Sequence, residues 1–275
     1  MDSHQDFRQA VDRPQDDIDL GRAALTIAEG DYPGLDIGAY LARIDRLAVA
    51  VTERLAAQSS VYRSVAALNT VLFQEQGFRG NRDDYFNPKN SFLNEVIERK
   101  TGIPITLSVL YMEVARRIGL PLQGIGFPGH FLVKHGGGNE EIVIDPFNGG
   151  EIKSREKLGQ MLYDLYGGKV AFHADFLEAM TKKQILRRML NNLKMIYLRD
   201  NDLMKSLSVM ERLLILDPAA AEDIRDRGLI YLKMECFKQA LQDLENYLRL
   251  APRAHDAEAV REQMVDLAKQ VSQIH

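Results

Sequence analysis

Two residues with the potential for acid–base chemistry lie at the ends of neighbouring predicted strands. His130 opens one strand and Asp145 closes the next. A histidine oriented by a carboxylate is the general base of many hydrolases and acyltransferases, where it activates a serine, a cysteine or water. The sequence has no cysteine close to this pair, because its single cysteine, Cys236, lies far downstream. The pattern therefore predicts a base and its orienting carboxylate without the commonest nucleophile.

The turn between the two strands predicts how the pair meets. Residues 136–139 read GGGN, a turn composition, between predicted strands at 130–135 and 141–145. A four-residue turn pairs residue 135 with 140 and, in the same register, His130 with Asp145. Opposed residues of an antiparallel pair have β-carbons about 4.5–5.5 Å apart. We therefore predict a hydrogen bond between the imidazole and the carboxylate.

Helices and a further strand must position this hairpin. Pro104 suits the first turn of a helix that ends at Gly119, and a strand is predicted at 122–126. Ser91 is predicted to cap a shorter helix that ends before Gly102, after a turn-rich loop at 77–89. Periodic apolar residues predict helices across 18–60 and at 61–76. The polar, acidic residues 1–17 are expected to be disordered or loosely attached.

The C-terminal part of the chain is predicted to be entirely helical and to contain a 34-residue repeat. Tyr197 recurs as Tyr231, and Asp217-Pro218 recurs as Ala251-Pro252. In the second copy Gly228 and Ala240 occupy the small positions of a tetratricopeptide repeat. Two repeats are fewer than the roughly three that stand alone, so we expect them to pack on the preceding domain or on helix 255–273. The apolar residues of 171–184 are expected to pack between the two parts; these are Phe172, Phe176, Leu177 and Met180.

Composition limits the classes of partner and compartment. The 275 residues carry a net charge of −4, with 45% apolar and 27% charged residues, which argues against nucleic acid as the main partner. No apolar run approaches the roughly 20 residues of a membrane span, so no membrane partner is expected. A single cysteine and a polar N-terminus favour a cytoplasmic protein. His130 and His135 point to opposite faces of a strand, so we predict no metal site, and no cofactor motif is present.

The middle of the chain resembles the transglutaminase-like core of the bacterial SirB family. The resemblance rests on NSFLNEVIERKTGIPITLSVLY, GFPGHFLVK and IDPFNGG and covers about residues 60–150. It implies an α+β protein with three parts: a helical N-terminal segment at 1–60, a papain-type core with a small antiparallel sheet at 61–175, and tetratricopeptide repeats at 180–275. In the wider superfamily the nucleophilic cysteine begins a helix. Counting back from the helix ending at 116–121 puts Pro104 at that place, while His130 and Asp145 match the other two triad positions.

Three interpretations of the missing nucleophile remain open. Ser108, one helical turn after Pro104, would substitute for the cysteine. Alternatively, His130 would activate water with Asn94 or Glu95 assisting. The interpretation we favour is a non-catalytic descendant that binds a protein or peptide through its repeats and a core cleft, with Asn94, Glu95 and Pro104 as binding residues. Such repeats commonly present concave surfaces to partners. A regulatory interaction protein is thus the first hypothesis, and a hydrolase or acyltransferase is the second.

Overall fold

The computed structural model describes residues 3–56, 59–136 and 141–273. The chain forms two compact units. The larger consists of Gln9–Met189, and the smaller of Met1–Arg8 together with Leu190–His275. Residues 9–60 therefore share a unit with the core, while the predicted three-part division at 60 and 175–180 stays a prediction. Each unit is described by itself.

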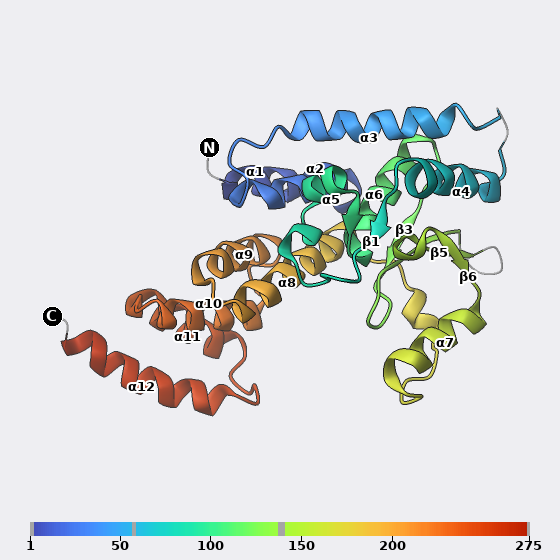
Figure 1. The fold of residues 1–275 in the computed structure, drawn as a ribbon. Coiled ribbons are helices and arrows are strands. Elements are labelled where there is room, and N and C mark those ends of the chain that lie inside the picture. The colour runs from blue at the N-terminus through green and yellow to red at the C-terminus, as the bar shows by residue number, and fades with distance from the viewer. Residues whose placement is uncertain (1–2, 57–58, 137–140, 274–275) are drawn as a thin grey trace. The chain divides into compact units, whose positions relative to one another are not determined.

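The larger unit contains a small antiparallel sheet surrounded by helices (Figure 1). Its α-helices are α2 (Leu20–Thr26), α3 (Ile37–Thr52), α4 (Val61–Asn69), α5 (Leu93–Arg99), α6 (Pro104–Arg117) and α7 (Arg155–Tyr166). Its strands are β1 (Arg79–Gly80), β2 (Thr101–Gly102), β3 (Gln123–Ile125), β4 (Leu132–His135), β5 (Ile142–Asp145) and β6 (Glu151–Lys153). Short helical turns are η1 (Gln15–Asp17), η2 (Ile27–Gly30), η3 (Thr70–Glu75), η4 (Pro88–Ser91), η6 (Pro146–Asn148) and η7 (Ala174–Leu177).

The main sheet has the order β3-β4-β5-β6, with every neighbouring pair antiparallel. In the β4–β5 pair His135 lies opposite Ile142 and Val133 opposite Ile144. The predicted register, which placed 135 opposite 140, is therefore wrong by two residues. The predicted turn at 136–139 falls largely on 137–140, outside the described residues. A shift of two preserves the alternation of faces, so the side chains that point to each side of the sheet stay the same.

Helix α6 is the central element of the larger unit. It contacts α2, α3, α4 and α5 as well as β3 and β4. Every residue from Pro104 to Ala115 is buried, which is the pattern of a helix enclosed on all sides. Pro104 occupies the first turn as predicted, and Thr106 Oγ1 satisfies the helix start by accepting a hydrogen bond from Ile103 N at 3.2 Å. Helix α6 is thus a fully packed core helix.

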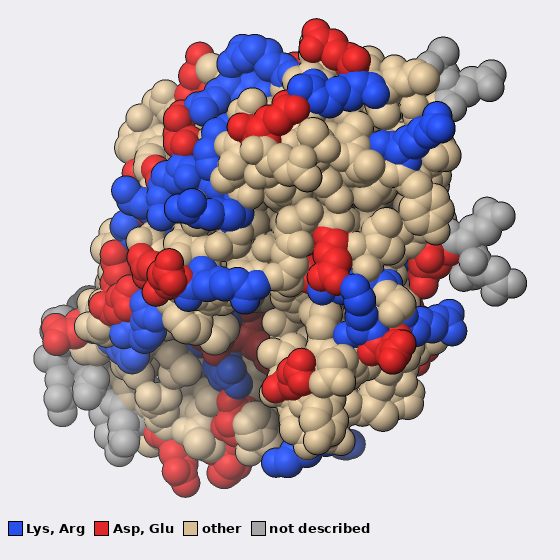
Figure 2. Space-filling model, turned by 45° about the vertical axis from the view of Figure 1, so that its right-hand side comes forward, with Lys and Arg blue, Asp and Glu red and all other residues tan. Residues whose placement is uncertain are grey.

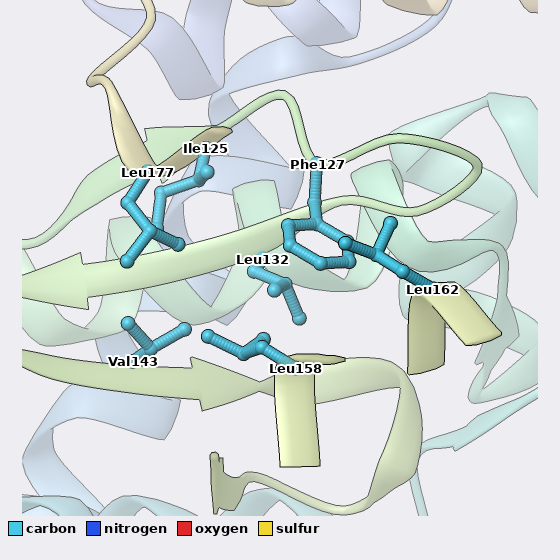
Figure 3. Packing of buried hydrophobic residues seen from close by; sticks show 7 residues of the cluster. All are labelled: Ile125, Phe127, Leu132, Val143, Leu158, Leu162 and Leu177. Carbon is cyan, nitrogen blue, oxygen red and sulfur yellow. The ribbon is translucent and has the colours of Figure 1, made fainter. Parts of the chain in front are cut away.

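A hydrophobic cluster joins β3, β4 and β5 to helix α7 (Figure 3). Its buried members are Ile125, Phe127, Leu132, Val143, Leu158, Leu162 and Leu177. Phe172 and Phe176 pack against the same cluster. These two and Leu177 were expected to pack between the core and the repeats. Instead they cover the sheet inside the larger unit, because the segment closes on β3 through a bridge between Ala179 and Ile125.

Asn69 connects α6 to the turn after η6. The hydroxyl of Tyr111 on α6 donates to Asn69 Oδ1 at 2.9 Å, and Asn69 Nδ2 donates to the carbonyl of Gly150 at 2.8 Å. Gly150 has φ +75°, and a β-carbon there would lie 1.9 Å from Asn69 Oδ1. Only glycine fits this position, because both the dihedral angle and the close amide exclude a side chain.

Two local predictions near the helix starts are wrong. Residues 3–11 form helix α1 (Ser3–Val11), in which Phe7 is fully buried and Val11 nearly so. Their spacing of four residues gives the helix one apolar face, although the composition around them is acidic and polar. Ser91 does not cap α5, because Phe92 holds that position and the Ser91 hydroxyl has no hydrogen-bond partner.

The smaller unit contains the helical repeats. Its helices are α9 (Leu203–Leu216), α10 (Ala221–Lys233), α11 (Phe237–Leu250) and α12 (Ala257–Gln273), preceded by the end of α8 (Lys182–Arg199). A β-carbon on Gly228 would lie 3.1 Å from Asp243 and Leu244, so α10 approaches α11 closely, as the repeat pattern predicts. Ala240 and Leu244 are fully buried in the α10–α11–α12 cluster. The helices, the small antiparallel sheet and the helical repeats confirm the predicted fold class.

Surface charge is mixed. Lys and Arg side chains occur beside Asp and Glu side chains over the face drawn in Figure 2. No described helix is both long and apolar enough to cross a membrane.

Candidate functional site

A tight turn before β4 presents His130. The amide of His130 donates to the carbonyl of Phe127 at 3.0 Å, with Pro128 and Gly129 between them. Gly129 has φ +68°, and a proline followed by a glycine of positive φ fits a type II turn. Phe127 fixes the start of the turn, since its buried ring points toward Leu162 of α7 (Figure 3). His130 therefore precedes the strand that was predicted to begin with it.

The predicted hydrogen bond between His130 and Asp145 is present. His130 Nε2 lies 2.9 Å from Asp145 Oδ1. The Asp145 side chain is fully buried, whereas that of His130 keeps 11% of its surface exposed. A continuation of the β4–β5 register places Asp145 opposite Leu132 instead of His130. The imidazole reaches the carboxylate diagonally, over a distance that long side chains span.

Polar groups from η6 and β6, together with His130, hold Asp145 as a carboxylate. Asn148 donates to it twice, from its backbone amide at 3.3 Å and from Nδ2 at 2.7 Å. Lys153 Nζ lies 3.6 Å from Oδ2. Burial by itself raises the pKa of Asp145, but the hydrogen bonds from His130 and Asn148 and the charge of Lys153 outweigh it and leave the pKa below its ordinary value. The carboxylate therefore stays charged and fixes the ring of His130.

Ser108 lies inside the core. It is fully buried on α6, and its hydroxyl has no hydrogen-bond partner, so it makes no bond to His130. A serine nucleophile needs both a hydrogen bond to its base and access to substrate. The structure joins His130 to Asp145 but does not bring Ser108 to either of them.

The other three predicted site residues have separate surroundings. Pro104 is buried at the start of α6. Asn94 is 2% exposed in the first turn of α5, and its Oδ1 has no hydrogen-bond partner. Glu95, the next residue, lies beside Tyr32; burial and the charge of this carboxylate raise the pKa of the tyrosine hydroxyl. Glu95 therefore faces the N-terminal helices of the larger unit.

A row of aromatic rings extends from His130 to the 81–91 loop. The ring of Phe147 lies edge-on to that of His130 at 5.7 Å, and Tyr85 lies edge-on to Phe147 at 6.4 Å. Phe86 follows at 5.4 Å from Tyr85. Tyr85 is 39% exposed and Phe86 58% exposed. We call Phe147, Tyr85 and Phe86 the aromatic strip. Arg82 adds a guanidinium over the Phe147 ring, 5.2 Å from its centre, and also donates to Asn148.

Asn90 fixes the backbone that carries the strip. It is fully buried, and its Nδ2 donates to the carbonyls of Asp84 at 2.7 Å and Tyr85 at 3.2 Å. Its Oδ1 accepts from Asn81 at 3.1 Å. The strip was not predicted from the sequence. The available signal was the adjacent pair Tyr85 and Phe86 inside a loop rich in charged residues, since large aromatic residues in exposed loops often mark binding surfaces.

Metal-ligating groups and the lone thiol give no second centre in the part of the chain that is described. No group of three or more His, Cys, Asp or Glu side chains there is placed to hold a metal ion. His135 Nδ1 lies 2.9 Å from the carbonyl of Pro121 instead of near His130. Cys236 is a half-buried free thiol at the start of α11, in the repeat unit.

Comparison with known proteins identifies the two parts. Residues 38–191 match the transglutaminase-like superfamily, and residues 193–265 match the tetratricopeptide repeat. A UPF0162 protein of Xylella fastidiosa strain 9a5c is 39% identical over 265 residues, covering 94% of this chain and 93% of the relative. The chain belongs to the UPF0162 family. It combines a transglutaminase-like core with tetratricopeptide repeats, as the sequence motifs predicted.

Other UPF0162 relatives are more distant but cover most of the chain. UPF0162 protein YchA of Escherichia coli K12 is 27% identical over 252 residues, covering 89% of this chain and 90% of that protein. A shorter similarity links this UPF0162 chain to F-box only protein 21 of Mus musculus. The two are 37% identical over 129 residues, which make up 46% of this chain and 21% of the mouse protein.

Proposed function

We propose that this UPF0162 chain is a cytoplasmic protein-interaction module, built on a transglutaminase-like core that no longer uses a cysteine nucleophile. In this proposal the His130–Asp145 pair organises a recognition surface, and the aromatic strip provides its main contacts. The repeats supply a second surface for protein or peptide partners, as such repeats commonly do. A regulatory role would follow from engaging partners without transforming them.

The observation that carries this proposal is the aromatic strip beside a fixed His130. Exposed tyrosine and phenylalanine side chains that lie edge to face and are held by a rigid loop are typical of binding hot spots. Asn90 keeps the loop rigid, so little entropy is lost when a partner binds. The resemblance puts Pro104 where the superfamily has its nucleophile, and Pro104 is buried at the start of α6.

Selection of a random dodecapeptide library on the full-length protein tests the proposal. Selected peptides, measured by titration calorimetry, should bind with micromolar affinity. Replacing Tyr85 with alanine should weaken them roughly tenfold, since aromatic hot spots contribute upward of about 1–2 kcal/mol. Tyr62→Ala is the matched control, because Tyr62 is 62% exposed on α4 and outside the strip. Equal affinity for the wild type and Tyr85→Ala would contradict the proposal.

The His130–Asp145 hydrogen bond supports a second candidate, a hydrolase that activates water. An imidazole oriented by a buried carboxylate is the arrangement of a general base. In this candidate Asp145 orients the ring through Nε2, and Nδ1 of His130 takes a proton from water. The Ser108 version of the same candidate would require α6 to expose a hydroxyl that is now fully buried. Ester and peptide substrates incubated with the wild type and His130→Ala test it, and equal rates would exclude His130 as a base.

A further inference from the structure

Arg188 of α8 lies directly behind the turn that presents His130. Its Nη2 donates to the backbone carbonyl of His130 at 2.6 Å. Its guanidinium also lies over the ring of Phe131, 5.5 Å from the ring centre. Both contacts belong to the larger unit. These contacts hold the guanidinium in place and use one of its N–H groups. An arginine has five N–H donors, so others are available to bind a ligand.

Arg188 has no acidic partner among the residues that the structure describes. Two other half-buried arginines do have one: Arg117 pairs with Glu113 at 2.6 Å, and Arg227 pairs with Asp243 at 2.7 Å. Burial of Arg188 without a carboxylate lowers its pKa below the ordinary value. An unpaired charge in a poorly solvated place is costly, and proteins usually pair such a charge or use it to bind an ion.

Two tyrosines, one from a loop and one from the end of α7, lie near this guanidinium. Tyr85 of the aromatic strip and Tyr166 at the end of α7 both lie within electrostatic range of Arg188. Tyr166 also approaches the His130 turn, because a β-carbon on Gly129 would lie 3.2 Å from its hydroxyl. Both tyrosines are more than a third exposed, and Arg188 itself keeps part of its surface exposed. A small group in solution can therefore reach the part of the guanidinium that stays exposed.

We propose that Arg188 is the receptor for a carboxylate group of the bound partner, with Tyr85 and Tyr166 close by. This inference rests on the proposed function, because the carboxylate belongs to a peptide lying along the aromatic strip. A planar guanidinium that lies over an aromatic ring, as Arg188 does over Phe131, matches a carboxylate through two parallel hydrogen bonds. The partner is then a peptide that carries an aromatic or apolar side chain next to a C-terminal, aspartyl or glutamyl carboxylate.

Benzoate is a suitable first probe, because it combines one ring with one carboxylate. Titration of the full-length protein with benzoate, followed by NMR, should shift the Arg188 Nε–H and the His130 ring resonances. Benzamide, which has the same shape without the charge, should not shift them. Arg188→Gln should weaken benzoate binding by tenfold or more, as expected for a charge-assisted bidentate contact. Arg188→Lys should restore the charge but only part of the affinity, because it lacks the planar fork.

Lys183→Gln is the matched control, since it removes one positive charge from the same helix. Equal benzoate affinity in Lys183→Gln and the wild type excludes a general charge effect. The dodecapeptides selected above identify the source of the carboxylate: they are remade with an amidated C-terminus or with Asn and Gln in place of Asp and Glu. One of these changes should weaken peptide binding to the wild type at least tenfold and leave peptide binding to Arg188→Gln unchanged.

The two proposals fail in different ways. If benzoate shifts neither resonance, or binds Arg188→Gln as well as the wild type, the carboxylate receptor is overturned. The peptide affinity of Tyr85→Ala then still tests whether the aromatic strip binds peptides. If the peptides bind Tyr85→Ala as tightly as the wild type while benzoate binding is lost in Arg188→Gln, Arg188 binds carboxylates but the aromatic strip is not the peptide surface.

Discussion

His130 and Asp145 are joined by a 2.9 Å hydrogen bond although the strand register does not place them opposite each other. The contact depends on the turn at 127–130, which moves the imidazole ahead of β4. It also depends on the buried position of Asp145, where Asn148 and Lys153 complete the shell of donors. The pair is thus an interaction between a turn and a strand end.

The pair predicts a specific dependence of stability on pH. The pKa of folded Asp145 lies below its ordinary value, so folding favours the carboxylate form. Its contribution is complete above the unfolded pKa of about 3.9 and is lost as the pH falls through the folded pKa. In Asp145→Asn the free energy of unfolding should fall less steeply below about pH 4, by up to about 1.4 kcal/mol per pH unit. Urea denaturation between pH 3 and pH 7 measures the slopes.

His130→Ala is the companion variant for that experiment. Without the imidazole, the hydrogen bond from His130 no longer opposes the effect of burial on Asp145. The pKa of Asp145 should therefore rise, and stability should be lost at a higher pH than in the wild type. Identical pH profiles for the wild type and both variants would mean that Asp145 has the same pKa in the folded and the unfolded protein.

The Ser108 hydroxyl should lower the free energy of unfolding, and we expect it to have no catalytic role. A buried hydroxyl without a hydrogen-bond partner loses its hydrogen bonds to water, and no hydrogen bond within the protein replaces them. Ser108→Ala should raise the free energy of unfolding by about 1 kcal/mol. Ser206→Ala should lower it by a similar amount, because Ser206 is equally buried but its hydroxyl donates to Asp202 at 2.8 Å. Thermal and urea denaturation of both variants compare the two; a large loss of stability in Ser108→Ala would point to an undetected partner.

Gly80 should control the place of Phe147 beside His130. A β-carbon on Gly80 would lie 2.5 Å from the Phe147 ring, so Gly80→Ala has to displace that ring. We expect a loss of about 1–3 kcal/mol in the free energy of unfolding and a shifted His130 ring resonance. Gly159→Ala on α7 is the control, because no atom lies within 4 Å of the added carbon. Phe147→Leu combined with Gly80→Ala should recover part of the loss, and additive effects would show that the two positions are independent.

Asn90 should determine the order of the aromatic loop. Asn90→Ala removes two donors to the loop backbone and leaves the carbonyls of Asp84 and Tyr85 without them. Hydrogen exchange of the 82–90 amides should accelerate by tenfold or more, with a stability loss of about 2 kcal/mol. Asn246→Ala, which removes only a side-chain contact with Arg249, should leave that exchange unchanged. Unchanged exchange in Asn90→Ala would mean that packing alone holds the loop.

The elements with local signals were predictable from the sequence, and the long-range contacts of the loops were not. Pro104 and Gly119 marked the central helix correctly, and the spacing of Gly228 and Ala240 revealed the repeats, because caps and periodicity depend on neighbouring residues. The hairpin register failed because turn length was inferred from composition. The aromatic strip and Arg188 escaped prediction because residues 82–86, 147 and 188 meet only in the folded chain. Whether Asn94, Glu95 or Pro104 binds a partner stays a prediction.

The amide of Asn69 makes two distant positions interdependent for any variation of this sequence. It accepts from Tyr111 on one side and donates to Gly150 on the other, at a separation where no β-carbon fits. A side chain at residue 150 therefore needs a smaller residue 69 and still strains the backbone at φ +75°, and a smaller residue 69 would leave the Tyr111 hydroxyl without this partner. A library that randomises residues 69, 111 and 150 together should therefore recover compensated combinations that single substitutions would miss.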